Sequence, residues 1–370
     1  MRVYRSDFFY KNISKILSRR RFFSAARTIT PLHYFGQRES IVEDLFQLSK
    51  VEMPINSFYD PFSGSGSISF AAIEQKKANN FHLNDSLPML KSFWEWVRIN
   101  PQSIVEIYSE LIEDYYRFPT HQRRNVYEKL LKTLRYQNNV LSKPYFAAIF
   151  AFLINFSEKN IPLFDKNLEL ATRPNVEIDH ESKLLKIKNF NDRITHLSHL
   201  FQVNKVFFSS GDYHKSIGSA KKGDLIIFDP PYPQQAHNIY YNIKTEIDLR
   251  ESLSQTFREL NERQVDFMVL YGAGDIPPSV QFRGLGLQHL IRLSCHPLYG
   301  EFLEHLYVSS TIPLNSASLP TGIIFYDQLF KPYKDVSSIN YDQALYILKL
   351  TKKSEQENSV FNEATVPRFK

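Results

Sequence analysis

The chain has 370 residues, of which 43% are hydrophobic and 23% charged, an ordinary composition for a globular protein. This length allows one large domain with an insertion, or two domains. The single cysteine, Cys295, excludes an internal disulfide and any metal cluster built from several cysteines, and it suits a reducing compartment. No apolar run is long enough to span a membrane, so we expect a soluble protein of the cytoplasm.

The net charge of +6 is concentrated at the amino terminus. Residues 1–27 contain eight arginines and lysines against a single acid, Asp7, whereas the rest of the chain is nearly neutral. Such an arm is compatible with a solvated tail, with a segment that binds nucleic acid phosphates, and with an organelle targeting segment rich in arginine and serine. The sequence leaves these three interpretations open.

The first strand–turn–helix unit contains a glycine-rich turn. A turn-like segment, 31–38, and a helix from about residue 39 to 49 precede it, and a strand is predicted at 55–59. The turn reads Asp60-Pro61-Phe62-Ser63-Gly64-Ser65-Gly66-Ser67, and an apolar helix starts after it. The backbone of such a turn can approach a ligand closely.

A second strand, predicted at 80–83, ends in Asn84-Asp85 about 20 residues after the glycine turn. An acid at this offset is placed to accept hydrogen bonds from a ribose diol. Asp85 also stands where it could cap a helix that starts near Leu87. The spacing favours ligand binding, and the capping role stays open.

Residues 88–156 have a helical pattern with few glycines. Five cations occur in one part of it: Arg123, Arg124, Lys129, Lys132 and Arg135. Such residues more often form a solvated helix face than a DNA-binding surface, and both interpretations stay open. The stretch 157–190 is polar and contains prolines, so we expect an irregular segment with little core of its own.

The alternation of helix and strand then resumes. A helix is predicted near 194–201, and a strand at 205–210 ends in Gly211-Asp212-Tyr213. A short apolar strand, 225–228, ends in Asp229-Pro230-Pro231-Tyr232. Prolines offer no N–H to a sheet, so this motif stiffens the chain just past the carboxyl end of the strand, where open α/β sheets bind ligands.

The last part of the chain completes the pattern. A helix is predicted at 246–262, followed by a strand at 267–272. The segments 302–310 and 322–326 also have the pattern of strands, and the tail after residue 352 is polar.

The motifs Asp60-Pro61-Phe62-x-Gly64-x-Gly66, Asn84-Asp85, Asp212-Tyr213 and Asp229-Pro230-Pro231-Tyr232, each after a strand, resemble those of the Dam-like adenine-N6 DNA methyltransferases. Their order is the alpha arrangement, in which the cofactor motifs precede the target-recognition insertion and the catalytic motif comes last. Residues 31–36 are similar to the amino-terminal cofactor motif of that family. The resemblance covers about residues 31–310.

This resemblance implies an α/β fold, with a doubly wound, mainly parallel, Rossmann-like methyltransferase sheet and a helical insertion. It divides the chain into a basic arm (1–30), the first part of the catalytic domain with the cofactor motifs (31–87), a helical target-recognition insertion (88–192), the second part of the catalytic domain (193–335), and a carboxyl-terminal helix and tail (336–370).

The resemblance also implies S-adenosylmethionine as the cofactor. Phe62, Gly64 and Gly66 would surround its methionine end, Asp85 would bind the ribose hydroxyls, and Asp212 would face the adenine. The full set of expected cofactor-binding residues is Tyr34, Gly36, Gln37, Asp60, Pro61, Phe62, Gly64, Gly66, Asp85, Asp212, Tyr213 and Asp229.

The expected catalytic residues are Asp229, Pro230, Pro231 and Tyr232. The lone pair of an exocyclic base amine is delocalised into the ring, so the amine is a weak nucleophile. Asp229 and the carbonyl of Pro230 would accept its N–H groups and direct the lone pair to the methyl group. Tyr232 would stack on a base that has left the duplex.

Two departures from the family pattern stand out. Gln37 occupies the place of a lysine that usually follows the glycine of the amino-terminal motif, and Arg38 comes next. The stretch 153–160 keeps only fragments of an Asn-Arg-x-x-x-Phe-Asn-type sequence that helps to form the target pocket in the family. The resemblance therefore carries over no recognition sequence.

The sequence thus predicts an adenine-N6 DNA methyltransferase that acts on double-stranded DNA with the target adenine flipped out, in the cytoplasm at the nucleoid. Methylation of cytosine N4 or of an amino group in RNA remains an alternative, as does a catalytically silent DNA-binding subunit of the same fold. A partner subunit or a cognate nuclease is compatible with the chain. The 11 histidines form no recognisable metal-ligand set, so no metal is expected.

Overall fold

The computed structural model describes residues 30–33, 39–49, 55–136, 143–158, 164, 169–176, 180–231, 246–271, 282, 284–296, 300–314, 319 and 323–325. Most of the predicted arm and the whole tail lie outside these residues, as do four predicted site residues, Tyr34, Gly36, Gln37 and Tyr232. No helix in the described part is long and apolar enough to cross a membrane.

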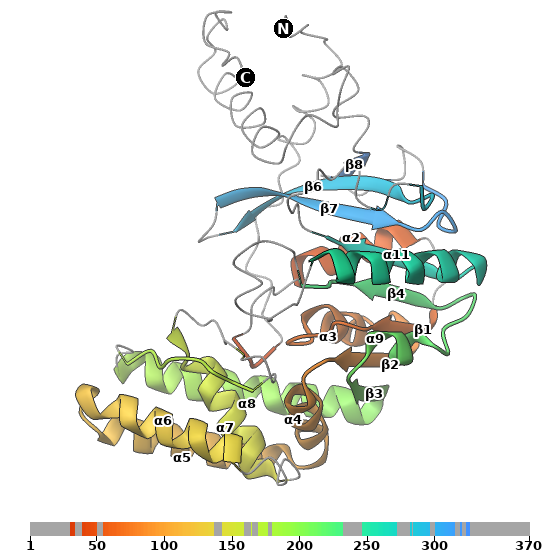
Figure 1. Ribbon diagram of the computed structural model, residues 1–370. Coiled ribbons are helices and arrows are strands. Elements are labelled where there is room, and N and C mark those ends of the chain that lie inside the picture. Colours follow the sequence, from red (N-terminus) through yellow and green to blue (C-terminus); the bar gives the residue numbers. More distant parts are fainter. Residues whose placement is uncertain are drawn as a thin grey trace, which may run out of the picture.

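The described residues form one eight-stranded sheet in the order β3-β2-β1-β4-β5-β7-β6-β8 (Figure 1). Its parallel strands are β1 (Ile55–Asp60), β2 (Ala78–Asp85), β3 (Lys205–Ser210), β4 (Leu225–Phe228) and β5 (Asp266–Leu270), and its antiparallel strands are β6 (Gln288–His296), β7 (Gly300–Val308) and β8 (Ile323–Phe325). The first three strands in the chain, β1, β2 and β3, extend the sheet towards one edge. The later strands, from β4 on, extend it towards the other edge. This reversal places a topological switch point between β1 and β4.

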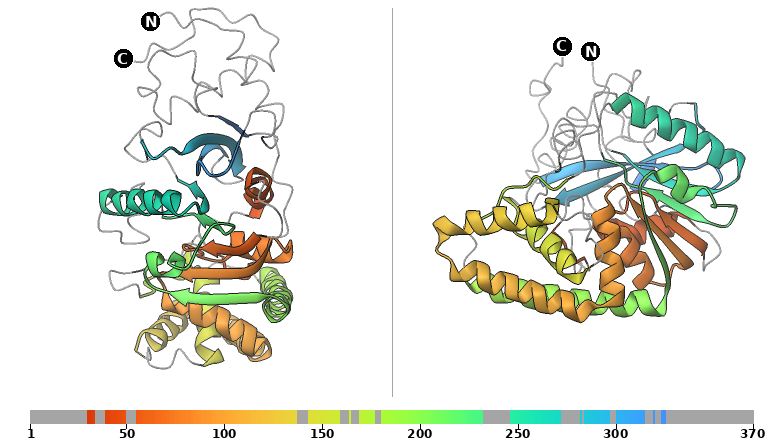
Figure 2. Two further views of the ribbon diagram at one scale, coloured as in Figure 1. Left: turned by 90° about the vertical axis from the view of Figure 1, so that its right-hand side faces the viewer. Right: turned by 60° about the horizontal axis from the view of Figure 1, so that its bottom comes forward.

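Helices cover both faces of the sheet, which confirms the predicted doubly wound α/β fold. The side chains of β4 show why: Leu225 and Ile227 join one hydrophobic core, whereas Ile226 and Phe228 join the other. A strand buried on both faces needs an unbroken apolar run, as this one has. Helices α2 (Glu39–Ser49), α3 (Ser67–Glu74) and α8 (His180–Val203) lie on the first face, and α9 (Tyr213–Ile217) and α11 (Glu246–Glu262) lie on the second (Figure 2).

A group of helices extends from one end of the sheet (Figure 1). It consists of α4 (Pro88–Ile99), α5 (Pro101–Arg117), α6 (Thr120–Tyr136) and α7 (Pro144–Asn155), together with the first part of α8. Helix α7 is buried from Phe146 to Asn155, so it forms the centre of this group. The side chains of α5 and α6, including Tyr108, Tyr115 and Tyr127, pack into the same core.

The structure corrects the expectation for residues 157–190. Helix α8 begins at His180, well before the predicted start near 194, and Phe190 is buried and stacks on Tyr108 with ring centroids 3.6 Å apart. The charged residues between 181 and 189 obscure the helical period in the sequence. Packing against α5, which lies about 80 residues earlier, determines this helix.

Strand β6 was not predicted, because its polar residues become acceptable in a sheet only through distant partners. Arg292 of β6 donates through Nε to Asp44 of α2 at 3.1 Å and through a terminal nitrogen to Glu304 of β7 at 2.7 Å. All three side chains are buried. The guanidinium thereby joins helix α2 to the antiparallel part of the sheet.

Replacement of this guanidinium should be costly. Arg292→Leu would leave two carboxylates of like charge buried together, so we expect a loss of about 3–5 kcal/mol in the free energy of unfolding, measured by denaturant titration. Arg117 pairs with Asp114 on the surface, and Arg117→Leu should cost less than about 1 kcal/mol. Equal losses in the two variants would contradict a structural role for the buried triad.

A pair of histidines lies between β6 and β7. His289 Nε2 and His305 Nδ1 are 3.0 Å apart, and the ring of His289 stacks on Tyr307. Burial lowers the pKa of His305 to about 4. Burial also lowers the pKa of His289, and so does the neighbouring His305.

Acid should therefore destabilise the fold through this pair. An unfolded histidine binds a proton near pH 6.5, whereas the folded protein resists protonation of His305 down to about pH 4. Stability is then complete above pH 6.5 and falls as the pH is lowered towards 4, by up to about 3 kcal/mol from His305. Denaturant titrations at several pH values should show a flatter profile for His305→Gln than for the surface control His121→Gln, and matching profiles would refute this cause.

Candidate active site

Three aspartates lie at the carboxyl ends of three neighbouring parallel strands. Asp60 ends β1, Asp85 ends β2 and Asp229 directly follows β4, and the sheet order places β1 between the other two. The carboxyl ends of parallel strands meet at one edge, so the three carboxyl groups share one region at the switch point. Asp85 and Asp229 both act electrostatically on Asp60.

The glycine-rich turn connects this edge to helix α3. Gly64 and Gly66 have φ angles of 49° and 78°, which L-residues with side chains rarely adopt. A Cβ at Gly66 would also lie 2.2 Å from the ring of Phe70, so both backbone conformation and packing require glycine there. The turn is held against the end of β2, because Ser63 N–H donates to the Asn84 carbonyl at 2.8 Å.

Asp85 supports two neighbouring segments at once. One carboxylate oxygen accepts from Gly64 N–H at 3.0 Å, and the other accepts from Leu87 N–H at 2.9 Å, at the start of α4. This bond to Leu87 lies just before the helix, and no side chain caps the start of α4, so the alternative that Asp85 caps the helix is wrong. Oδ1 also accepts weakly from the Ser86 hydroxyl at 3.5 Å, whereas Oδ2 keeps a further lone pair, so ribose binding by Asp85 stays a compatible prediction. Desolvation raises the pKa of Asp85, against the lowering effect of these two N–H groups.

Asp60 is the most strongly perturbed acid of this edge. It is 1% exposed, and one of its oxygens accepts from Ser69 Oγ at 2.6 Å, while the other, Oδ1, has no hydrogen-bond partner among the described residues. Burial, assisted by the charges of Asp229 and Asp85, raises the pKa of Asp60 to about 7, although the Ser69 hydroxyl and the backbone N–H of Phe62 both lower it. A buried acid of this kind at a switch point marks a functional site.

The family model of the D12 class N6 adenine-specific DNA methyltransferases matches residues 34–310. The chain belongs to this family. It is therefore a DNA adenine methyltransferase, which confirms the predicted family and enzyme class. Methyltransferases of this kind use S-adenosylmethionine.

Two further likenesses accompany the family match. The Type II methyltransferase M1.LlaDCHI of Lactococcus lactis subsp. cremoris is 23% identical over 224 residues, which cover 58% of this chain and 71% of the relative. The rRNA methyltransferase aviRa from Streptomyces viridochromogenes aligns over 79% of this chain and 95% of its own, with 9% identity and a TM-score of 0.34. We draw no conclusion from the second likeness, because it is too distant.

The residues of this edge fit the cofactor of the methyltransferase. S-adenosylmethionine carries a sulfonium and an ammonium group, and the edge presents three carboxyl groups, one with an unpartnered buried oxygen on Asp60. A cation bound at this edge would offset the burial and the repulsion that raise the pKa of Asp60. The ring of Phe62 contributes an apolar surface beside them, with its centroid 4.9 Å from that of Tyr213.

Asn84 joins two loops of the site, although its role was not anticipated. Its side chain is buried and donates to the carbonyls of Pro61 and Gly211, at 3.1 and 3.2 Å. These carbonyls belong to the loops after β1 and β3. Asn84 therefore holds the loop that carries Asp212 against the one that leads into the glycine turn.

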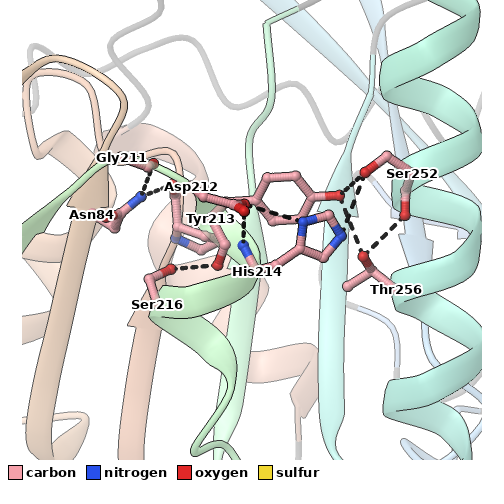
Figure 3. A network of polar contacts seen from close by, with 9 residues as sticks. Asn84, Gly211, Asp212, Tyr213, His214, Ser216, Ser252 and Thr256 are labelled. Atoms are coloured by element: carbon pink, nitrogen blue, oxygen red, sulfur yellow. Dashed lines mark hydrogen bonds and ion pairs between the residues drawn. The ribbon is translucent and has the colours of Figure 1, made fainter.

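Asp212 and Tyr213 begin a polar network that extends to helix α11 (Figure 3). One oxygen of Asp212 accepts from the backbone N–H of His214 at 2.9 Å and faces His214 Nδ1 at 3.1 Å. His214 Nε2 lies 3.4 Å from the Ser252 hydroxyl, which lies 2.8 Å from the Tyr213 hydroxyl. The hydrogen bond from the His214 backbone lowers the pKa of Asp212, and the His214 ring adds to this effect. Nothing in the local sequence points to Ser252.

The stretch that retains fragments of the family's target motif has a structural role. Asn155 donates to the Pro31 carbonyl at 2.9 Å and to the Tyr108 hydroxyl at 3.0 Å, and it accepts from His33 N–H at 2.7 Å. It is buried. The insertion thus holds the segment that leads into residues 34–37, where three of the predicted cofactor residues lie outside the described part.

The five cations of α6 divide into two groups. Arg123 lies over the ring of Tyr116 at 4.6 Å and donates to the Val176 carbonyl, and Arg135 donates to the Leu170 carbonyl. These two hold the segment 169–176 against the helix. The other three are exposed: Arg124, Lys129 and Lys132.

Replacement of Asp60 by asparagine should raise the stability of the protein and weaken its binding of the cofactor. A folded-state pKa of about 7 lies above the 3.8 of an ordinary aspartate, so the wild-type protein loses stability as the pH rises through this interval. Asp60→Asn avoids that loss. We expect a variant that is more stable than wild type by about 3–4 kcal/mol above pH 7, with the difference vanishing below about pH 4.

Denaturant titrations at pH 5 and pH 8 would measure this effect, and calorimetry would measure cofactor affinity. The same variant should bind S-adenosylmethionine more weakly, because it lacks the negative charge. A stability difference that does not grow between the two pH values would show that Asp60 is not the titrating group.

Proposed function

We propose that the methyltransferase transfers the methyl group of S-adenosylmethionine to the exocyclic N6 of an adenine flipped out of double-stranded DNA. The observation that carries this proposal is the position of Asp229. It follows the buried central strand β4 at the switch point, next to the strand that ends in Asp60. When bound, S-adenosylmethionine would supply the methyl group: its bond to sulfur breaks as the bond to N6 forms, S-adenosylhomocysteine is the leaving group, and the amine proton passes to Asp229 or to water.

The residues of this chain then act on the amine. Asp229 accepts one N–H of the adenine amine and the Pro230 carbonyl accepts the other, which concentrates the lone pair on nitrogen. Pro230 and Pro231 limit the backbone freedom of both acceptors, so the geometry is set before the base arrives. Tyr232 stacks on the extruded base.

Asp85 and Asp212 would hold the ribose and the adenine of the cofactor, and the glycine turn with Phe62 would surround its methionine end. Asp60 would face the cationic part. This assignment is supported by the shared edge of the three aspartates and by the link that Asn84 makes to the Asp212 loop.

DNA would contact the exposed cations of α6. Arg124, Lys129 and Lys132 belong to the helices that extend beyond the sheet, and their side chains make no ion pair within the described residues. Phosphate contacts of this kind give affinity without sequence preference. The relative from Lactococcus is a Type II methyltransferase, which supports a role beside a cognate nuclease.

The test is transfer of labelled methyl groups to mixed-sequence duplex DNA, with single-stranded DNA and RNA as alternative substrates. Wild-type protein should label duplex DNA, and digestion should yield N6-methyladenine. Asp229→Ala should reduce the rate by at least about a hundredfold at saturating cofactor. Asp266→Asn, at the opposite end of neighbouring β5, is the matched control and should retain activity.

Other outcomes identify other functions. Label recovered as N4-methylcytosine or in RNA would keep the mechanism and replace the substrate. Cofactor binding without transfer to any of these substrates would indicate a subunit that needs a partner. Equal activity of Asp229→Ala and wild type would refute the assigned role of Asp229.

A further inference from the structure

Hydrogen bonding around Asp212 exceeds what a helix cap requires. Asp212 caps the short helix α9 when its Oδ1 accepts from His214 N–H, and this contact needs no imidazole. Yet the same oxygen also faces the imidazole Nδ1, and the far side of that ring faces Ser252, 38 residues later in α11 (Figure 3). Capping alone does not explain the second set of contacts.

The direction of these hydrogen bonds follows from the groups involved. The carboxylate of Asp212 can only accept, so Nδ1 of His214 carries a proton. In the neutral ring Nε2 then accepts, and the Ser252 hydroxyl donates to it. The Ser252 hydroxyl also lies 2.8 Å from the Tyr213 hydroxyl, which lies 3.3 Å from Thr256 Oγ1, and either oxygen of each pair can be the donor. Thr256 does not compete for the nitrogen, because its hydroxyl donates to the Ser252 carbonyl at 2.9 Å.

The backbone N–H and the Nδ1–H of His214 therefore both point towards Asp212. The carboxylate is thereby held in one orientation, with Oδ1 used by His214 and with Oδ2 making no hydrogen bond among the described residues. The side chain of Asp212 is half exposed, so this oxygen is accessible to a ligand. A group that only accepts recognises an amino group and repels a carbonyl oxygen.

We propose that His214, supported by Ser252 and Tyr213, is a positioning residue that holds the Asp212 carboxylate so that Oδ2 accepts from the 6-amino group of the cofactor's adenine, and that this orientation strengthens discrimination against a 6-oxo purine. This inference rests on the proposed cofactor role of Asp212. The network also ties the adenine end of the site to α11, the helix that follows the catalytic motif in the chain.

Two ligands that differ only at the 6-position of the purine test the proposal. S-adenosylhomocysteine has a 6-amino group and S-inosylhomocysteine a 6-oxo group, and calorimetry with the full chain gives the ratio of their dissociation constants. Wild type should prefer the amino ligand by about a hundredfold. His214→Ala and Ser252→Ala should each reduce this ratio, the first by about tenfold.

Two further variants separate positioning from a general loss of structure. His214→Asn keeps a donor near the place of Nδ1 and should retain most of the ratio. Ser254→Ala is the matched control, because among the described residues the Ser254 hydroxyl bonds to the Arg250 carbonyl of its own helix and to no other group. Thermal denaturation of each variant verifies that it is folded.

The outcomes are distinct. An unchanged ratio in His214→Ala, or an equal loss of affinity for both ligands, overturns the inference and leaves the proposed function intact. Failure of the wild-type protein to bind S-adenosylhomocysteine overturns the proposed cofactor site and this inference together. A reduced ratio in His214→Ala, largely retained in His214→Asn and unchanged in Ser254→Ala, supports it.

Discussion

Parallel strands present their carboxyl ends at a single edge, and in this methyltransferase three neighbouring strands each lead into an aspartate there. Asp60 sits between the other two and is buried, so charge on it is opposed both by lost solvation and by Asp85 and Asp229. The fold tolerates this repulsion because two hydrophobic cores stabilise the central strands from both faces. A cationic ligand is the natural complement of such an edge.

The loops around this edge are joined by side chains rather than by packing alone. Asn84 links the loops after β1 and β3, and Asp85 links the glycine turn to α4. Farther out, Asn155 ties the helical insertion to residues 31–33. Because each link spans elements distant in sequence, the position of the site depends on the whole sheet and on the insertion.

The polar residues that the sequence analysis did not explain have a common feature. In the sequence alone, Arg292 and His289 are unfavourable residues for a buried strand, and Ser252 gives no sign of a function. Each acquires its role from a partner on another helix or strand. Pairing of this kind cannot be recognised from local pattern, since it depends on which strands and helices become neighbours. The same reason concealed the beginning of α8, where packing against Tyr108 outweighs a polar local sequence.

The local sequence by itself determined the strands other than β6, the glycine turn, the motif at Asp229 and the family, because apolar periodicity and turn chemistry act over a few residues. It left the function of Asp85 open between capping and ligand binding. Only the tertiary structure decided that Asp85 bonds to Gly64 and Leu87 without capping α4, that Asp60 is a buried acid with a raised pKa, and that His214 joins Asp212 to Ser252. These properties arise from the solvation and neighbours of a side chain, which exist only once the chain has folded.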